Sequence, residues 1–272
     1  MEATTPAYPT RLSEAQWAIL AVYFAADSPL GRPRKTNLRA VVEAILYVLR
    51  AGCPWRMLPS DFPPWQTVYG YFRRWRDNGT ARENRAHWQR IHRYLRQWVR
   101  LHRKRHQSPS VAIVDTQSVP LGCLTQRARG FDGGKRVKGR KRHVLVDSMG
   151  LLLAVVVTAA NIADRQGLPP LLRRLQFRRG WFRRLQLIWG DWAYWGHLLF
   201  EWVLEQFDCM LEVLERPGGR GFRVVPRRWV VERTLAWISR CRRLSQDYEK
   251  LPRTSETFIY LAMIQLMLKR LA

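Results

Sequence analysis

The stretch SVAIVDTQSV, residues 110–119, decides how the rest of the sequence is interpreted. Four apolar residues, Val111 to Val114, form a short run that is typical of a buried β-strand, and an acid, Asp115, follows directly. The whole chain has 47 Lys and Arg but only 21 Asp and Glu. A carboxylate at the end of a buried strand in so basic a chain therefore needs an explanation.

The composition of the 272-residue chain indicates a folded protein that binds a polyanion. Hydrophobic residues make up 47% and include 13 Trp, which is enough for one large core, or for one core plus a smaller helical domain. A net charge of +26 makes a compact state repel itself unless a polyanion neutralises it, which favours nucleic acid as the partner and an anionic membrane surface as the second choice. Because we find neither a run of 18 apolar residues nor a signal peptide, we expect an intracellular protein without a membrane partner.

Residues 1–108 are predicted to form a small helical DNA-binding domain. The predicted helices span 11–24, 37–52, 64–79 and 82–105. A short connection from Gly52 to Pro64 joins the second helix to the third, which suggests a helix-turn-helix-like unit, although such helix pairs are common. The third helix offers DNA phosphates three arginines, Arg73, Arg74 and Arg76.

From residue 109 to 272 the pattern predicts an α/β catalytic domain. Strands are expected at 111–119, 141–150, 151–160, 185–191 and 209–216, and helices at 165–178, at 197–207 and from Pro226 onward. The second and third strands meet at a hairpin around Gly150. The order β-β-β-α-β-α-β-α is that of a ribonuclease H-like fold, a mixed five-stranded sheet with helices on both faces.

Three acids are predicted to meet in this fold. Asp191 ends the fourth strand, and if that strand lies beside the first, Asp191 and Asp115 repel each other unless a cation lies between them. Glu232 lies on the predicted helix after Pro226, on the side opposite its apolar residues. Three carboxylates suit Mg²⁺ or Mn²⁺, and two such ions about 3.5–4 Å apart activate an attacking hydroxyl and stabilise the leaving oxygen of a phosphodiester.

Each acid also has a purely structural interpretation. Asp115 and Asp191 can form turns after their strands, and Glu232 suits the first turn of a helix. Their joint placement favours a metal site. Two competing acids, Asp147 and Asp164, are assigned to a hairpin turn and to a helix N-cap.

At these residues the chain resembles bacterial transposases of the IS5 family, within the IS4/IS5 group of DDE enzymes, over nearly its whole length. The similarity lies in the segments 31–80, DTQSV (115–119), 133–167, GDWAYWG (190–196) and 229–270. The resemblance implies that Asp115, Asp191 and Glu232 are the catalytic, metal-binding triad. It also implies double-stranded DNA as substrate, with cleavage and strand transfer at terminal inverted repeats, a homodimer in the synaptic complex, and a place in the bacterial cytoplasm beside the nucleoid.

The wider IS4 group carries a Tyr-Arg-Glu-Lys signature around the helix acid. Arg228 and Glu232 match its arginine and its acid, whereas Val225 and Ser239 stand at the tyrosine and lysine positions. The candidates that replace the lysine are Arg240 and Arg243, and both, together with Arg228, are predicted to bind DNA phosphates near the acid. If Glu232 is misassigned, Glu249 is the replacement.

The glycine-rich basic segment 126–143 is predicted to be a loop beside Asp115 that binds DNA phosphates, although a solvated run of charges is the usual alternative. Its assigned DNA-binding residues are Lys135, Arg136, Lys138, Arg140, Lys141 and Arg142. Trp192 is a candidate for stacking on a base, or packs against the strand end. A second cluster is either a contact to flanking DNA or a basic surface, and comprises Arg173, Arg174, Arg178, Arg179, Arg183 and Arg184.

A cut-and-paste transposase is the leading interpretation of these patterns. The alternatives are a catalytically inactive or repurposed DNA-binding protein of the same fold, and a nuclease without strand transfer. Terminal inverted repeats beside the coding region distinguish the first from the other two.

Overall fold

The computed structural model of the chain describes residues 8–24, 35–77, 86–122, 127–176, 184–214 and 228–272. The four helices predicted for the N-terminal part are confirmed as α1 (Glu14–Ala21), α2 (Leu38–Ala51), α3 (Trp65–Asp77) and α4 (His87–His102). Helix α2 begins at Asn37, whose side chain accepts from the amide of Ala40, and it ends at Gly52 as predicted. Gly52 adopts φ 75°, a conformation that a residue with a side chain rarely takes.

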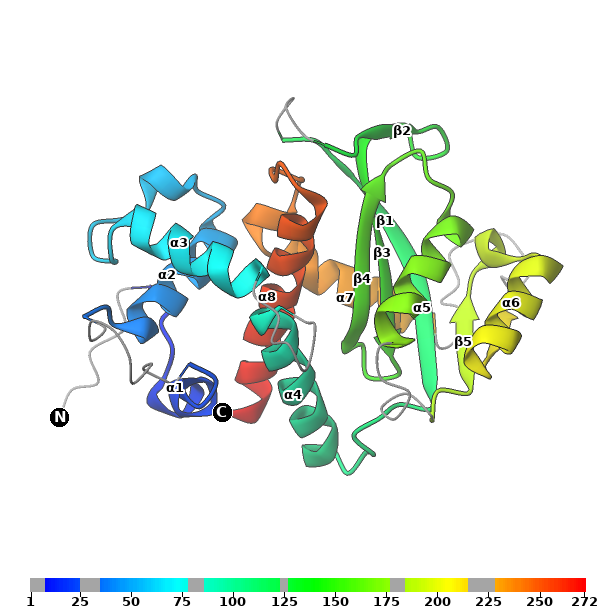
Figure 1. Cartoon of the computed structure of the whole chain (residues 1–272), viewed down its shortest axis with the longest axis horizontal. Helices are drawn as coiled ribbons and strands as arrows, with labels where there is room; N and C mark the ends of the chain where they lie inside the picture. The colour runs from blue at the N-terminus through cyan, green and yellow to red at the C-terminus, as the bar shows by residue number, and fades with distance from the viewer. Residues whose placement is uncertain (1–7, 25–34, 78–85, 123–126, 177–183, 215–227) are drawn as a thin grey trace.

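Helix α8 (Pro252–Leu271), at the C-terminal end of the chain, packs against helices from its N-terminal part. It lies between the N-terminal helices and the sheet (Figure 1), and it packs against α4, α2, α1 and β4. Thr254 to Ile264 are all buried, so this apolar C-terminal helix belongs to the core. One apolar core runs from the N-terminal helices to one face of the sheet. The predicted domain boundary between residues 108 and 109 stays a prediction. Residues on both sides of it belong to the same apolar core.

The sheet has the strand order β2-β3-β1-β5-β6, with β4 also paired to β3. Its strands are β1 (Val111–Pro120), β2 (Gly130–Asp132), β3 (Val137–Asp147), β4 (Leu152–Ala159), β5 (Leu187–Gly190) and β6 (Met210–Val213). Strand β3 is antiparallel to β1 and β4, whereas β1, β5 and β6 run parallel. The ribonuclease H-like fold class is therefore confirmed, with β2 as a short strand that the sequence did not predict.

Helices cover both faces of the sheet (Figure 1). On one face, α5 (Leu168–Gln176) and α6 (His197–Phe207) contribute to a core with Ala112 and Val114 of β1. On the other, α7 (Trp229–Ser239) and α8 pack over Ile113. Short 3₁₀ turns η1 (Trp55–Met57), η2 (Asp164–Gly167), η3 (Trp192–Tyr194) and η4 (Arg242–Leu244) connect these elements. Among the described helices, none is sufficiently long and apolar to span a membrane.

Two expectations about the strands are wrong. The strand expected at 111–119 is confirmed as β1, but Asp115 lies within it and does not end it, because β3 pairs with β1 from Asp115 opposite Val144 to Pro120 opposite Gly139. The predicted loop over 126–143 is therefore largely strand. Gly139 permits this close pairing, since a Cβ at that position would lie 1.9 Å from the carbonyl oxygen of Val119.

Candidate active site

The register of the parallel strands brings Asp115 and Asp191 to the same level of the sheet. Ile113 of β1 pairs with Trp189 of β5, and each acid follows two residues later. Side chains alternate between faces along a strand, so Asp115 shares the face of Ile113, over which α7 packs. The Asp115 side chain accepts from the amide of Thr116 at 2.7 Å. Asp191 caps η3 by accepting from the amide of Ala193 at 3.1 Å.

The electrostatics of this pair show that the two carboxylates repel each other. Burial raises the pKa of Asp115 to about 6, and the negative charge of Asp191 adds to the rise. The amide of Thr116 and the positive charge of Arg228 act in the opposite direction. Asp115 and Asp191 are therefore a pair of carboxylates whose negative charges the protein balances only in part.

Glu232 reaches this pair through an arginine. Arg228 precedes α7, and its guanidinium lies 3.7 Å from an oxygen of Asp191 and 3.6 Å from an oxygen of Glu232. Half of the Glu232 side chain is exposed, on the side of α7 opposite the buried Val230 and Val231, as predicted. In the described part of the chain, no three His, Cys, Asp or Glu side chains are close enough together to hold a metal ion. The structure thus brings Asp115 and Asp191 together, and connects Glu232 to Asp191 through Arg228.

Tyr194 is a residue of this site that the sequence analysis missed. It is fully buried, and its hydroxyl has no hydrogen-bond partner within the described residues. Burial raises its pKa well above 10, and the negative charges of Asp115, Asp164 and Asp191 add to this. Its ring packs against Gly190, where a Cβ would lie only 2.9 Å away. The only signal in the sequence is its place three residues after Asp191.

These side chains fit an oxygen-seeking divalent cation in their chemistry. Asp115 and Asp191 supply adjacent carboxylates whose mutual repulsion a cation relieves. The unpartnered Tyr194 hydroxyl is a neutral donor beside them, which suits a carboxylate oxygen or an ordered water. Arg228 contributes one positive charge near Asp191 and Glu232. A divalent cation would contribute two.

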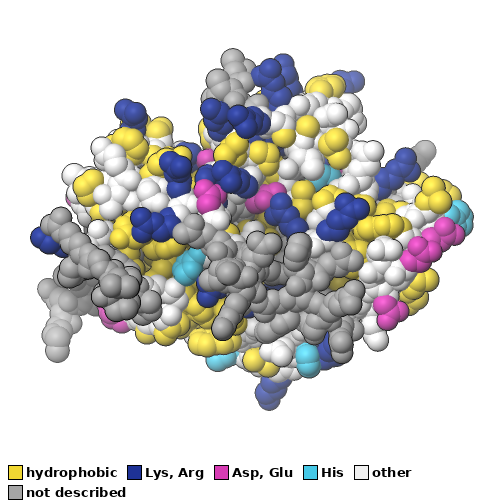
Figure 2. All heavy atoms as spheres, in the orientation of Figure 1, with side chains coloured by type: hydrophobic (Ala, Val, Ile, Leu, Met, Phe, Trp, Pro, Cys, Tyr) yellow, Lys and Arg dark blue, Asp and Glu magenta, His cyan; other side chains and the backbone are white. Residues whose placement is uncertain are grey.

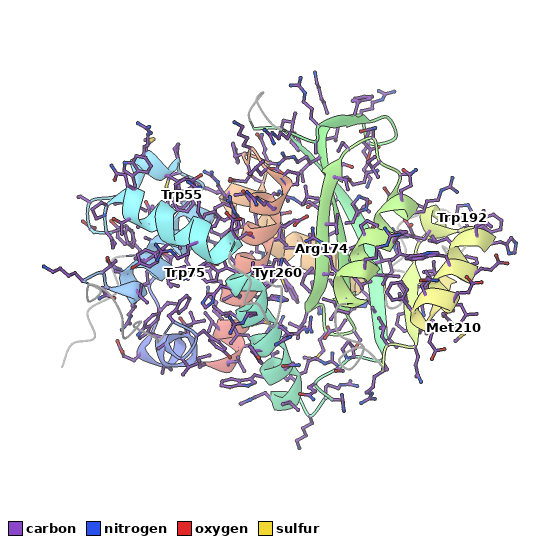
Figure 3. All side chains as sticks on the ribbon, in the orientation of Figure 1. Trp55, Trp75, Arg174, Trp192, Met210 and Tyr260 are labelled. Carbon is purple, nitrogen blue, oxygen red and sulfur yellow. The ribbon has the colours of Figure 1, made fainter. Side chains whose placement is uncertain are left out.

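Several residues predicted to contact DNA lie on the surface. Those with exposed side chains are Arg73, Arg74, Lys135, Arg136, Lys138, Trp192 and Arg240. Trp192 is 62% exposed and stacks on Trp195 with ring centres 5.6 Å apart. Figure 3 shows it at the end of the molecule far from the N-terminal helices. Lys and Arg side chains gather on the upper part of the face in Figure 2, with fewer acids among them.

Arg140, Lys141 and Arg142 are not part of an exposed phosphate-binding loop, and this prediction is wrong. All three side chains are buried in β3. Arg140 pairs with Asp247 at 3.1 Å, Lys141 with Asp164 at 2.7 Å, and Arg142 donates to the carbonyl of Leu244 at 2.8 Å. Because β3 has strands on both sides, these cations are held inside the protein by partners from distant segments.

Arg76 and Arg243 also turn inward, against the prediction. Arg76 donates to Asp77 and to Thr254, at 2.6 and 2.8 Å. Arg243 pairs with Glu249 at 2.7 Å and donates to the carbonyl of Cys53 at 3.0 Å. Arg240 therefore remains as the exposed candidate for the missing lysine.

The remaining acids have structural partners. Glu249, the alternative to Glu232 as third acid, is buried and pairs with Arg243, so its carboxylate is already engaged. Asp147 is fully buried, pairs with Arg100 and accepts from the amides of the β3–β4 turn, in agreement with its turn assignment. The N-cap assignment of Asp164 is wrong, because Ala163 is the N-cap of η2. Outside the described residues lie Val225, Pro226, Arg178, Arg179 and Arg183.

Comparison with known proteins gives consistent matches. A family model described as "Transposase DDE domain" matches residues 106–267, and one described as "Putative transposase of IS4/5 family" matches residues 12–84. A curated relative from Burkholderia cepacia, "Putative transposase for insertion sequence element IS402", is 30% identical over 116 residues, which are 41% of this chain. The match spans about half of that relative, 54% of its length.

A solved structure, the Mos1 mariner paired end complex with Mn, is also similar, with 16% identity and a TM-score of 0.25. The match covers 68% of this chain and 61% of that one. The fold assignment rests on the strand order and not on this weak likeness.

Proposed function

Because the chain belongs to the DDE-domain transposases, of the IS4/IS5 type, we propose that it cleaves DNA at the terminal inverted repeats of an insertion sequence and joins the freed ends to target DNA. Asp115, Asp191 and Glu232 are the catalytic residues of this proposal, and they hold Mg²⁺ or Mn²⁺. The protein acts as a homodimer in the synaptic complex, in the bacterial cytoplasm. The observation that carries the proposal is the strand register that sets Asp115 beside Asp191.

In this mechanism the acids hold the cation, and the arginine responds to DNA. When bound, a divalent cation of this kind activates an attacking water or 3′-hydroxyl and stabilises the leaving oxygen. A DNA phosphate competes for the Arg228 guanidinium, whose contacts to Asp191 and Glu232 are long, so both acids become available as ligands. Tyr194 keeps its proton at any physiological pH, because burial raises the pKa of its hydroxyl, so it adds no charge among the acids.

The exposed Lys and Arg side chains bind DNA phosphates without regard to the base sequence. Lys135, Arg136 and Lys138 lie around the β2–β3 turn, which follows the strand of Asp115. Arg240 follows the helix of Glu232, and the N-terminal pair Arg73 and Arg74 adds contacts on α3. Such contacts position the phosphate backbone without reading bases, and Trp192 stacks on an exposed base.

The test replaces each acid without changing its size. Asp115→Asn, Asp191→Asn and Glu232→Gln should each abolish cleavage and strand transfer on a duplex that carries the repeat, while repeat binding persists. Asp208→Asn and Glu201→Gln, both at acids on or beside α6, are the matched controls and should retain activity. Near wild-type cleavage by any one acid variant would show that this acid is misassigned.

The same assay separates the alternatives. A wild-type protein that cleaves but never joins ends is a nuclease without strand transfer. One that binds repeat DNA but does neither in Mg²⁺ or Mn²⁺ is a repurposed DNA-binding protein.

A further inference from the structure

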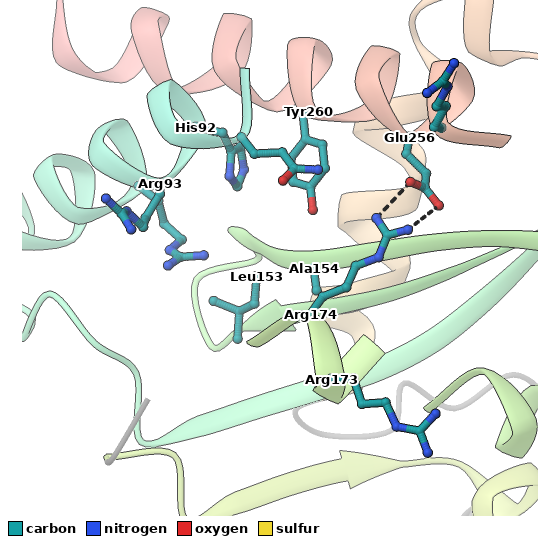
Figure 4. Close-up of a pocket in the computed structure, with 11 residues that line it drawn as sticks. His92, Arg93, Leu153, Ala154, Arg173, Arg174, Glu256 and Tyr260 are labelled. Carbon is teal, nitrogen blue, oxygen red and sulfur yellow. Dashed lines mark hydrogen bonds and ion pairs between the residues drawn. The ribbon is translucent and has the colours of Figure 1, made fainter. Parts of the chain in front are cut away.

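A cavity of about 360 Å³ lies where α4 and α8 meet β4 and α5 (Figure 4). It is lined by Gln89, His92, Arg93, Arg96, Leu153, Ala154, Arg173, Arg174, Arg253, Glu256 and Tyr260. Strand β4 is separated from β1 by β3, so this cavity lies on the other side of β3 from the proposed active site. None of Asp115, Asp191 and Glu232 lines it.

The wall of the cavity carries an excess of positive charge. Among its lining residues, all of them described, five arginines face a single carboxylate, that of Glu256. Three of these arginines have partners outside the lining, since Arg173 lies over the ring of Trp202, Arg93 lies over the ring of Tyr94, and Arg253 pairs with Asp77. Arg93, Arg96 and Arg174 are the inner three, and Figure 4 shows Arg174 of α5 reaching Glu256 of α8 at one end of the cavity and Arg93 of α4 at the other.

The three inner guanidinium groups are held in place by packing. Arg93 and Arg96 are only 2% and 4% exposed, and Arg96 donates to the carbonyl of Leu152 at 3.1 Å. Arg174 makes two hydrogen bonds to Glu256, at 2.7 and 2.9 Å. Glu256 in turn accepts from the amide of Val157 in the edge strand β4, at 3.0 Å. Donors fixed in this way lose little freedom when they bind a ligand.

We propose that this cavity is a binding site for a small phosphate-bearing anion. Planar guanidinium forks match the oxygens of a phosphate group, and about 300–1,000 Å³ is the usual volume of a small-molecule site. A duplex cannot enter a cavity of 360 Å³ between buried arginines, so the phosphate belongs to a free small molecule or to the terminal phosphate of a single strand. Bound there, it bridges α4 of the N-terminal part to α5 of the sheet, and therefore stabilises their contact.

The probe is inorganic pyrophosphate, titrated calorimetrically into the full chain, with sodium chloride of equal ionic strength as the blank. Arg93→Gln combined with Arg96→Gln should weaken binding about a hundredfold or more, because each charged hydrogen bond that is removed is worth about tenfold or more in affinity. Lys104→Gln combined with Arg105→Gln removes the same charge from the exposed turn after α4 and should leave the affinity unchanged. This control separates the cavity from the general attraction of a +26 chain.

Hydrogen exchange on the wild-type chain tests the site even if the buried variant does not fold. Pyrophosphate should slow amide exchange in residues 87–102 and 252–271, and leave residues 65–77 unchanged. A 5′-phosphorylated single strand that competes with pyrophosphate identifies DNA as the source of the phosphate, and a strand that does not compete identifies a free small anion. No saturable binding, equal loss of affinity in both double variants, or no protection of α4 and α8 overturns the proposal.

Discussion

Two groups of charged residues in this protein are built differently. Beneath β3, Arg140 pairs with Asp247 at 3.1 Å and Arg243 with Glu249 at 2.7 Å, and all four side chains are buried. At the candidate active site, Arg228 lies 3.7 and 3.6 Å from its two acids, and Asp115 keeps a raised pKa.

The difference shows which charges serve the fold. In the buried network, each carboxylate that pairs with a guanidinium does so at short range, and Arg140 also donates to backbone carbonyls of Glu249 and Lys250. At the active site, the carboxylates lie near each other and their arginine is held only loosely. This looser pairing fits the proposal that the site accepts a cation and a phosphate, because carboxylates and guanidinium groups already neutralised at short range would bind neither.

The largest expected effect is the loss of a buried cation from the network. Arg140→Met should lower the free energy of unfolding by about 3–5 kcal/mol, because it removes the guanidinium that balances the buried charge of Asp247. Urea unfolding followed by Trp fluorescence measures this. Lys138→Met, two residues earlier but exposed, is the control and should change stability by less than about 0.5 kcal/mol. Equal stabilities for the two variants would contradict the comparison.

The next effect has the opposite sign. The folded pKa of Asp115, about 6, lies above its ordinary value of 3.8, so the folded state holds this proton more tightly than the unfolded state. The contribution of this proton to the free energy of unfolding is therefore complete below about pH 4, and it is lost as the pH rises through 6. Asp115→Asn should stabilise the metal-free protein at pH 7 by about 1–3 kcal/mol and have no such effect at pH 4. Unfolding curves at both pH values measure this, and a destabilised variant at pH 7 would show that Asp115 is paired like the network acids.

Arg228→Gln should change stability by less than about 1 kcal/mol, since its ion pairs are long. It should instead tighten binding of Mn²⁺ without DNA by about tenfold at pH 8. A unit positive charge close to a divalent ion costs about 1–2 kcal/mol in a water-like dielectric. Calorimetry with Mn²⁺ tests this. Weaker Mn²⁺ binding in a folded variant would mean that Arg228 orients the acids and does not compete with the ion.

The smallest effect on stability is expected from the exposed half of the basic segment. Lys135→Ala, Arg136→Ala and Lys138→Ala together should leave the unfolding free energy within about 0.5 kcal/mol of wild type. Duplex affinity should fall for all sequences alike, and the log–log salt dependence should flatten by about 0.9 for each DNA phosphate that the variant no longer neutralises. Affinities for repeat and unrelated duplexes over a range of salt measure this, with circular dichroism as the folding control. An unchanged slope would mean that these cations face solvent only.

The sequence alone determined most of the secondary structure and the order of the strands. Helical spacing predicted α2 and its end at Gly52, and apolar runs predicted β1, β4 and β5. These features depend on contacts within a few residues, so they are visible in the local pattern. The placement of Asp115 and Asp191 was also predictable, because parallel neighbouring strands carry their following residues to the same edge.

Only the tertiary structure decided which cations are exposed. Lys138 and Arg140 stand two residues apart in one basic segment, yet the first is exposed and the second is buried against Asp247, 107 positions away. The burial of Tyr194 also depends on distant segments, because it belongs to a core with Ala112 and Val114 of β1. A side chain becomes structural or functional according to the partners that folding brings to it, and partners so distant in the chain leave no periodic pattern in the sequence.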